Sequence, residues 1–100
     1  MLFFKKKYFD AIRAGTKTTT LRYWQVRRAK PDSIHLVRGL GQLHVTAVRI
    51  VEFNELTDKD ARRDGFENIS ELQRTLDEYY PSENRQGRNL YLVKFKFLSK

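Results

Sequence analysis

The sequence predicts an α+β fold in which a small mixed β-barrel carries helices on its outside and over one end. The expected elements run strand, helix, three strands, two helices, strand, so strands outnumber helices. No helix regularly connects one strand to the next, as a parallel sheet would need. The apolar phase of the longest expected strand shifts from Leu43, Val45 and Ala47 to Val48 and Ile50. This shift indicates either burial on both faces or a bulge of the kind that helps a barrel to close.

Five segments are expected in the first half: a strand at 1–4, a helix at 5–14, a strand at 18–24, a basic loop at 25–33 and a strand at 34–38. The helix has one apolar face, made by Tyr8, Phe9 and Ile12. Gly15 lies where a left-handed residue would end it.

The second half is expected to hold a strand at 42–53, a short helix from 57, a longer helix from 70, a loop at 82–89 and a strand at 90–98. Thr57 and Asp60 resemble a capping box, and Gly65 would end that helix. Ser70 would cap the longer helix, which Pro81 stops.

Size and composition limit the functional classes. The 100 residues predict one domain spanning 1–100. Without cysteine there is neither a disulfide nor a thiolate metal site, and His35 and His44 lack metal-ligand spacing, so no metal and no cofactor are expected. No apolar run approaches the roughly 20 residues of a membrane span, and no signal-peptide core follows the N-terminal lysines. A cytoplasmic monomer without a membrane partner is the default expectation.

The charge is strongly positive. Twenty Lys and Arg residues face 12 Asp and Glu residues, which gives a net charge of +8. This balance suits a polyanion, most simply nucleic acid, although a basic surface with no specific partner has the same composition. Serine-hydrolase, P-loop and dinucleotide-binding motifs are missing from the sequence.

The run from Gly15 to Arg22 carries most of the functional information. It places a glycine turn, Lys17, three threonines and Arg22 within eight residues. On a strand, Thr20 and Arg22 share one face and could line a groove, while Leu21 meets the core. An exposed strand start with high β-propensity is the structural alternative.

In this order of motifs the chain resembles the ASCH domain of the PUA-like superfamily. The resemblance rests on Gly15, Lys17, Thr20 and Arg22, and on three further segments: 56–66, the helix start at 70–72 with Tyr80-Pro81, and 90–95. It covers nearly the whole chain. It implies a PUA-like β-barrel with a cleft that binds RNA or a nucleoside.

The resemblance is nearest to small bacterial members that are amidohydrolases of N4-acetylcytidine. It implies Thr20 as nucleophile, Lys17 as its base, and Asp64 as the group that orients water or protonates the leaving amine. Many ASCH domains have Glu where this chain has Thr20, which favours this branch. Asp64 departs from the family's Glu and is one methylene shorter. A binding module and a metal-independent amidohydrolase therefore both remain open.

Five further residues are candidates for ligand binding: Gly15, Arg22, Trp24, Arg27 and Arg28. Trp24 could stack on a base, and Arg27 and Arg28 could steer RNA from their loop. The alternatives are a core tryptophan and a solvated basic loop. Tyr79 and Tyr80 are expected to pack on a helix face.

Overall fold

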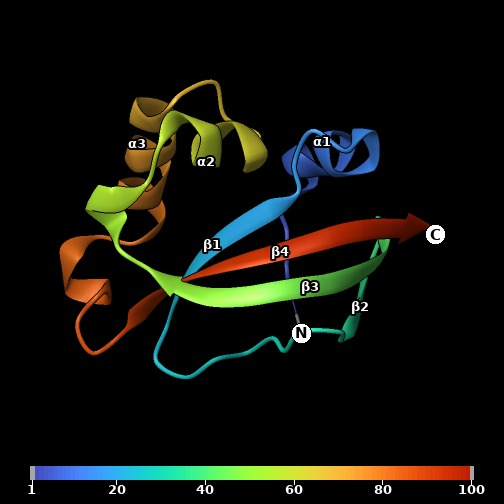
Figure 1. The fold of residues 1–100 in the computed structure, drawn as a ribbon, viewed down its shortest axis with the longest axis horizontal. Coiled ribbons are helices and arrows are strands. Elements are labelled where there is room, and N and C mark those ends of the chain that lie inside the picture. Colours follow the sequence, from blue (N-terminus) through green and yellow to red (C-terminus); the bar gives the residue numbers. More distant parts are fainter. Residues whose placement is uncertain (1, 100) are drawn as a thin grey trace.

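The computed structural model describes residues 2–99 and contains a curled, half-barrel sheet of four antiparallel strands with helices against it (Figure 1). The strand order is β1-β4-β3-β2, and the bounds are Thr19–Trp24 for β1, Ile34–Val37 for β2, Gly41–Val51 for β3 and Asn89–Ser99 for β4. The helices are α1 (Phe9–Ala14), α2 (Asp58–Arg63) and α3 (Ile69–Tyr79). The predicted α+β class is thereby confirmed. Among the described residues, no helix is long and apolar enough to cross a membrane.

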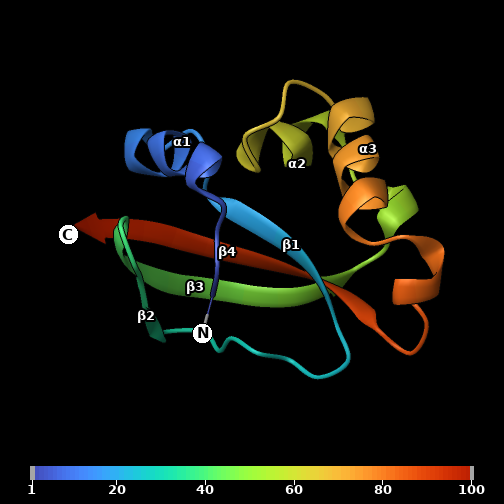
Figure 2. The ribbon, with the colours of Figure 1, turned by 180° about the vertical axis from the view of Figure 1, so that it is seen from behind.

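The N-terminal strand predicted at 1–4 is wrong for the residues described. Residues 2–5 form no strand, and the N-terminal segment crosses over the sheet instead of joining it (Figure 2). Leu2 is 1% exposed and packs against Trp24 and Val45, while Phe4 packs edge-to-face on Phe95. The apolar residues that suggested a strand cover the sheet's inner face. Met1 lies outside the described residues.

Three features that the local sequence predicts are present in the structure. Gly15 ends α1 with a φ of 80°, as predicted. Thr57 and Asp60 form the predicted capping box of α2. A register shift between Val45 and Ala47 confirms the predicted bulge in β3.

The predicted start of α3 at Ser70 is wrong. The cap is Asn68, whose Oδ1 accepts from the Glu71 N–H at 3.0 Å. Asp58 of α2 accepts from the Ile69 N–H at 2.8 Å, so a tertiary contact holds the first turn of α3. Because α2 supplies that acceptor, the helix begins earlier than its own sequence indicates.

Apolar side chains pack on both faces of the sheet. On one face α2 and α3 cover β1 and β4, with Leu72 and Leu76 against Leu21 and Leu92. On the other face α1 contributes Phe9 and Ile12 to a second cluster. As a result, β1 is enclosed from both sides, so that Thr19 and Thr20 are buried and Arg22 is partly buried.

Candidate ligand-binding site

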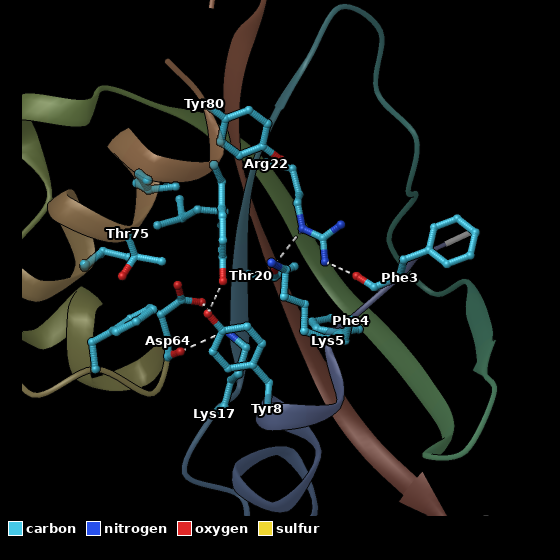
Figure 3. Close-up of a pocket in the computed structure, with 15 residues that line it drawn as sticks. Phe3, Phe4, Lys5, Tyr8, Lys17, Thr20, Arg22, Asp64, Thr75 and Tyr80 are labelled. Carbon is cyan, nitrogen blue, oxygen red and sulfur yellow. Dashed lines mark hydrogen bonds and ion pairs between the residues drawn. The ribbon is translucent and has the colours of Figure 1, made fainter. Parts of the chain in front are cut away.

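A cavity of about 400 Å³ opens where the N-terminal segment, β1 and α3 meet (Figure 3). Its polar lining consists of Lys5, Lys17, Thr20, Arg22, Asp64 and Thr75. Its aromatic lining consists of Phe3, Phe4, Tyr8, Phe66, Tyr79 and Tyr80. A small-molecule site has this composition: mostly apolar walls with a few convergent polar groups.

Two glycine turns bring Lys17 to this cavity. Gly15 adopts a left-handed conformation, after which the Thr16 and Lys17 N–H groups both donate to the Ala11 carbonyl. Gly65 has a φ of +94°, and a Cβ added there would lie 3.4 Å from the Lys17 Cβ. The turn after α2 therefore passes directly over the Lys17 side chain, which allows Asp64 to meet it.

Lys17 and Asp64 form a buried ion pair. Each residue is 4% exposed, and the Lys17 Nζ lies 2.9 Å from the Asp64 Oδ1. The Lys17 Nζ also donates to the Thr19 carbonyl at 3.0 Å and to the Asp64 carbonyl at 2.8 Å. These three acceptors engage all the donors of an ammonium group. The Thr19 hydroxyl adds a second bond to the Asp64 Oδ1 at 3.1 Å.

Burial works against the charge on both partners. It lowers the pKa of Lys17 below its ordinary value of 10.5, while the attraction and hydrogen bond of Asp64 act in the opposite direction. Burial likewise raises the pKa of Asp64, opposed by Lys17 and by the Thr19 hydrogen bond. Each charge is thus stabilised mainly by its partner in a poorly hydrated place.

Aromatic rings enclose this ion pair from the cavity side. The Lys17 Nζ lies 5.1 Å from the centroid of the Tyr8 ring and 5.9 Å from that of Phe66. The hydroxyls of Tyr8 and Tyr79 lie 2.8 Å apart and link the N-terminal segment to α3. Burial, with the Tyr79 hydrogen bond, raises the pKa of Tyr8. Burial also disfavours ionised Tyr79, but the hydrogen bonds from Tyr8 and Lys7 outweigh it and lower the pKa of Tyr79.

Arg22 occupies the other end of the cavity (Figure 3). Its Nε donates to the Thr20 Oγ1 at 2.9 Å, and its Nη2 donates to the Phe3 carbonyl. Its guanidinium carbon lies 5.0 Å from the centroid of the Phe4 ring. Thr20 accepts from a cation here, so its own hydroxyl proton is free to point elsewhere.

The structure brings four of the predicted site residues to one cavity. Lys17, Thr20, Arg22 and Asp64 all line it. Asp64 is distant in sequence from the other three residues. It reaches the cavity because α2 packs against the start of β1, where the Thr18 N–H donates to the Arg63 carbonyl at 2.7 Å.

The other predicted binding residues do not line this cavity. Trp24 is 8% exposed and packs among Leu2, Ala29 and Val93 in the core. It follows Arg22 by two positions on the strand, but the N-terminal segment covers it. Arg27 and Arg28 lie exposed on their loop, and Gly15 shapes the turn without lining the cavity.

The prediction from sequence missed the α3 wall and the N-terminal wall. Leu72, Thr75, Leu76, Tyr79 and Tyr80 line the cavity at the three- and four-residue spacing of one helix face. The sequence predicts helix-face packing for Tyr79 and Tyr80, but the partner of that face cannot be read from the spacing. Among residues 2–99, no three His, Cys, Asp or Glu side chains gather as metal ligands.

Comparison with solved structures places the fold. Hypothetical protein PH0355 matches with a TM-score of 0.79 and 20% identity, over 96% of this chain and 95% of that one. An ASCH domain from Lactobacillus crispatus JV V101 matches with a TM-score of 0.78 and 16% identity, over 92% of this chain and 70% of that one. Protein EF3133 from Enterococcus faecalis V583 matches with a TM-score of 0.69 and 17% identity, over 93% and 71%.

These likenesses show the fold that the motifs predicted. The chain has the architecture of an ASCH domain, and ASCH domains are PUA-like. No family model matches the sequence, and no curated protein matches it. The similarity is one of fold, so the predicted relationship to N4-acetylcytidine amidohydrolases stays a prediction.

Proposed function

We propose that the cavity binds a single nucleoside, either free or as one unit of an RNA strand. The observation that carries this proposal is the cavity itself: about 400 Å³, walled by aromatic rings, with six polar side chains in its lining. Small-molecule sites occupy about 300–1,000 Å³, which leaves room for one base and its sugar. The ASCH fold and the net charge of +8 are consistent with such a ligand.

The chemistry of the walls suits a nucleoside. A base stacked on an aromatic side chain gains about 1–3 kcal/mol, and the cavity offers Tyr8, Tyr79 and Tyr80 among others. The Thr20 hydroxyl accepts from Arg22 and keeps its proton to donate, whereas the Thr75 hydroxyl donates to the Glu71 carbonyl and can still accept. Together they offer a donor and an acceptor to the edge of a base. A cavity of this size has room for one base and its sugar.

Binding can be tested with a cavity-filling variant and a matched control. Thr75→Phe would fill the cavity, and within residues 2–99 the Thr75 hydroxyl donates only to the Glu71 carbonyl of its own helix. The control is Arg74→Phe, an equally large change at an exposed neighbour outside the cavity. Calorimetric titration with cytidine and N4-acetylcytidine should show binding to the control and at least a tenfold loss in Thr75→Phe. Equal binding to both variants would place the ligand elsewhere.

Salt dependence separates the two forms of the ligand. Binding of an RNA strand should weaken steeply as salt rises, because phosphate contacts release counterions. Binding of a free nucleoside should change little. A titration of cytidine and of a short cytidine oligonucleotide at low and high salt therefore distinguishes a free nucleoside from an RNA unit.

Amidohydrolysis of an N4-acylated cytidine is the second candidate, because Lys17, Thr20 and Asp64 line the same cavity. In that reaction the Thr20 oxygen would attack the acyl carbon while a base takes its proton, and the amine would leave protonated as the C–N bond breaks. Water would then hydrolyse the acyl-threonine ester, which releases the carboxylic acid and restores the Thr20 hydroxyl. The contact of Arg22 with Thr20 would stabilise a developing alkoxide.

The geometry of Lys17 favours binding over hydrolysis. A general base needs a free lone pair, and the Lys17 ammonium is held by three acceptors. No hydrogen bond joins Lys17 to Thr20 among the described residues. Loss of the acyl group from N4-acetylcytidine, followed by absorbance, tests the second candidate. Turnover that disappears in Thr20→Ala and persists in Thr20→Ser would establish it, and turnover unchanged in Thr20→Ala would exclude Thr20 as the nucleophile.

A further inference from the structure

The two ends of the cavity differ in net charge. At one end Lys17 and Asp64 neutralise each other at 2.9 Å. Towards the other end lie Lys5 and Arg22, and Asp64 is the only carboxylate among all the cavity-lining residues. Two cations therefore line the cavity without a counter-charge of their own.

Both cations keep unused hydrogen-bond donors. Arg22 uses its Nε for Thr20 and one Nη2 proton for the Phe3 carbonyl, which leaves Nη1 and the other Nη2 proton without an acceptor in residues 2–99. Lys5 has no ion pair and no hydrogen-bonded side chain in the same range. Its ammonium lies 4.5 Å from the centroid of the Tyr79 ring, at the cavity wall.

The Arg22 guanidinium is also held in a fixed orientation. The Phe4 ring lies 5.0 Å from it, and the bonds to Thr20 and Phe3 fix its plane. A fixed guanidinium with free N–H groups presents a preorganised fork, which matches the oxygens of a phosphate. Lys5 adds a mobile point charge beside it. A neutral nucleoside leaves both groups unused.

We propose that the ligand carries a phosphate group that binds between Arg22 and Lys5, so that the cavity recognises a nucleotide unit and not a bare nucleoside. This inference rests on the proposed nucleoside site and adds the chemical class of its ligand. The phosphate belongs either to a free nucleoside monophosphate or to the phosphodiester of an RNA strand. The Lys17–Asp64 pair, already neutral, lies beside the base or sugar.

The experiment compares cytidine with three ligands that add a phosphate to it, one of which also carries a second cytidine. Cytidine, cytidine 5′-monophosphate, cytidine 3′-monophosphate and a cytidine dinucleotide are titrated into the protein by calorimetry. At least one phosphate-bearing ligand should bind about tenfold more tightly than cytidine, as charge-assisted hydrogen bonds imply. A monophosphate that binds more tightly than the dinucleotide identifies a free nucleotide, and the reverse order identifies RNA.

A matched pair of neighbouring lysines locates the phosphate. Lys5→Gln should reduce the ratio of nucleotide affinity to cytidine affinity about fivefold or more, whereas Lys6→Gln should leave that ratio unchanged, since Lys6 is exposed and does not line the cavity. If cytidine binds and no phosphate-bearing ligand binds more tightly, the inference is overturned and the nucleoside site stands. If none of the four ligands binds, the nucleoside site and the inference both fail. If Lys5→Gln and Lys6→Gln reduced this ratio equally, long-range attraction to the positive surface would explain the preference for nucleotides. The placement of the phosphate beside Lys5 would then be overturned.

Discussion

The cavity holds a buried basic side chain, Lys17, and a partly buried one, Arg22, which differ in how fully their hydrogen-bond donors are used. Lys17 directs its ammonium at three protein acceptors and lies against a carboxylate of opposite charge. Arg22, at the other end, has two protein acceptors and no carboxylate, and part of its fork remains free. Both residues come from the same eight-residue run of sequence.

The difference separates a structural cation from a binding cation. A buried charge whose donors are all satisfied fixes the position of its partners, here the turn after α2 against β1. A buried charge with spare donors leaves a place for a ligand. On this basis we assign Lys17 a structural role in the cavity wall and Arg22 a role in binding the ligand.

The largest effect is expected at the ion pair. Lys17→Met or Asp64→Leu alone should lower the free energy of unfolding by about 3–5 kcal/mol, because each leaves a buried charge without its partner. The double variant should lose about 2–3 kcal/mol less than the sum of the two single losses. Urea denaturation measures all three, with Lys6→Met as an exposed control. Strictly additive losses would show that the two groups do not depend on each other.

The dependence of Lys17 on Asp64 should also appear in the pH profile of stability. In Asp64→Asn the attraction that raises the pKa of Lys17 is lost, so burial lowers that pKa further. Between the folded pKa and 10.5 the unfolded chain then holds more protons, and stability rises with pH in this window. The free energy of unfolding of the variant, relative to the unchanged protein, should therefore increase from neutral pH towards 10.5. If the difference in free energy of unfolding between Asp64→Asn and the unchanged protein stayed constant across this pH range, the proposed coupling of Lys17 to Asp64 would be contradicted.

A smaller loss of stability is expected at the end of the cavity where Arg22 lies. Arg22→Lys keeps the charge but removes the planar contacts with Thr20 and the Phe3 carbonyl, at a cost of about 1–2 kcal/mol. The N-terminal segment loses its anchor, so the backbone amides of residues 3–5 should exchange hydrogen faster. Arg49→Lys, at an exposed position with no ion pair among the described residues, serves as the control. Unchanged exchange at residues 3–5 would show that Arg22 does not hold this wall.

The smallest loss of stability is expected from the hydrogen bond between Tyr8 and Tyr79, which links the N-terminal segment to α3. Tyr8→Phe removes the 2.8 Å hydrogen bond to Tyr79 but keeps the ring beside Lys17, so the loss should be about 0.5–1.5 kcal/mol. Tyr91→Phe is the control, because the Tyr91 hydroxyl has no hydrogen bond within residues 2–99. Thermal unfolding of the two variants should rank Tyr8→Phe below Tyr91→Phe, and the opposite order would assign the Tyr8 hydroxyl no stabilising role.

Much of the candidate site was accessible from local sequence. Gly15, Lys17, Thr20 and Arg22 lie within one turn and one strand, where the positive φ of a glycine and the alternation of strand residues decide the arrangement. The same local rules placed the cap of α2. They did not exclude Trp24 from the cavity, because strand alternation says which face a residue shares but not which segment covers it.

Other parts depended on contacts that no local pattern contains. The N-terminal residues have high β-propensity, yet they cross the sheet because Leu2 and Phe4 pack on its inner face. Asn68 and Ser70 are both good caps, and Asp58 of another helix selects the first. Tyr8 and Tyr79 meet across 71 positions of sequence. Propensity gives no information at such separations.

The sequence by itself determined the class of fold, the glycine-shaped turn before β1 and the residue types available to the site, because these follow from backbone sterics and short-range periodicity. Only the tertiary structure decided that Asp64 neutralises Lys17 and that Lys5 and Arg22 keep free donors beside the same cavity. Whether a charge is available to a ligand depends on every acceptor that the folded chain brings within reach, and those acceptors come from distant segments.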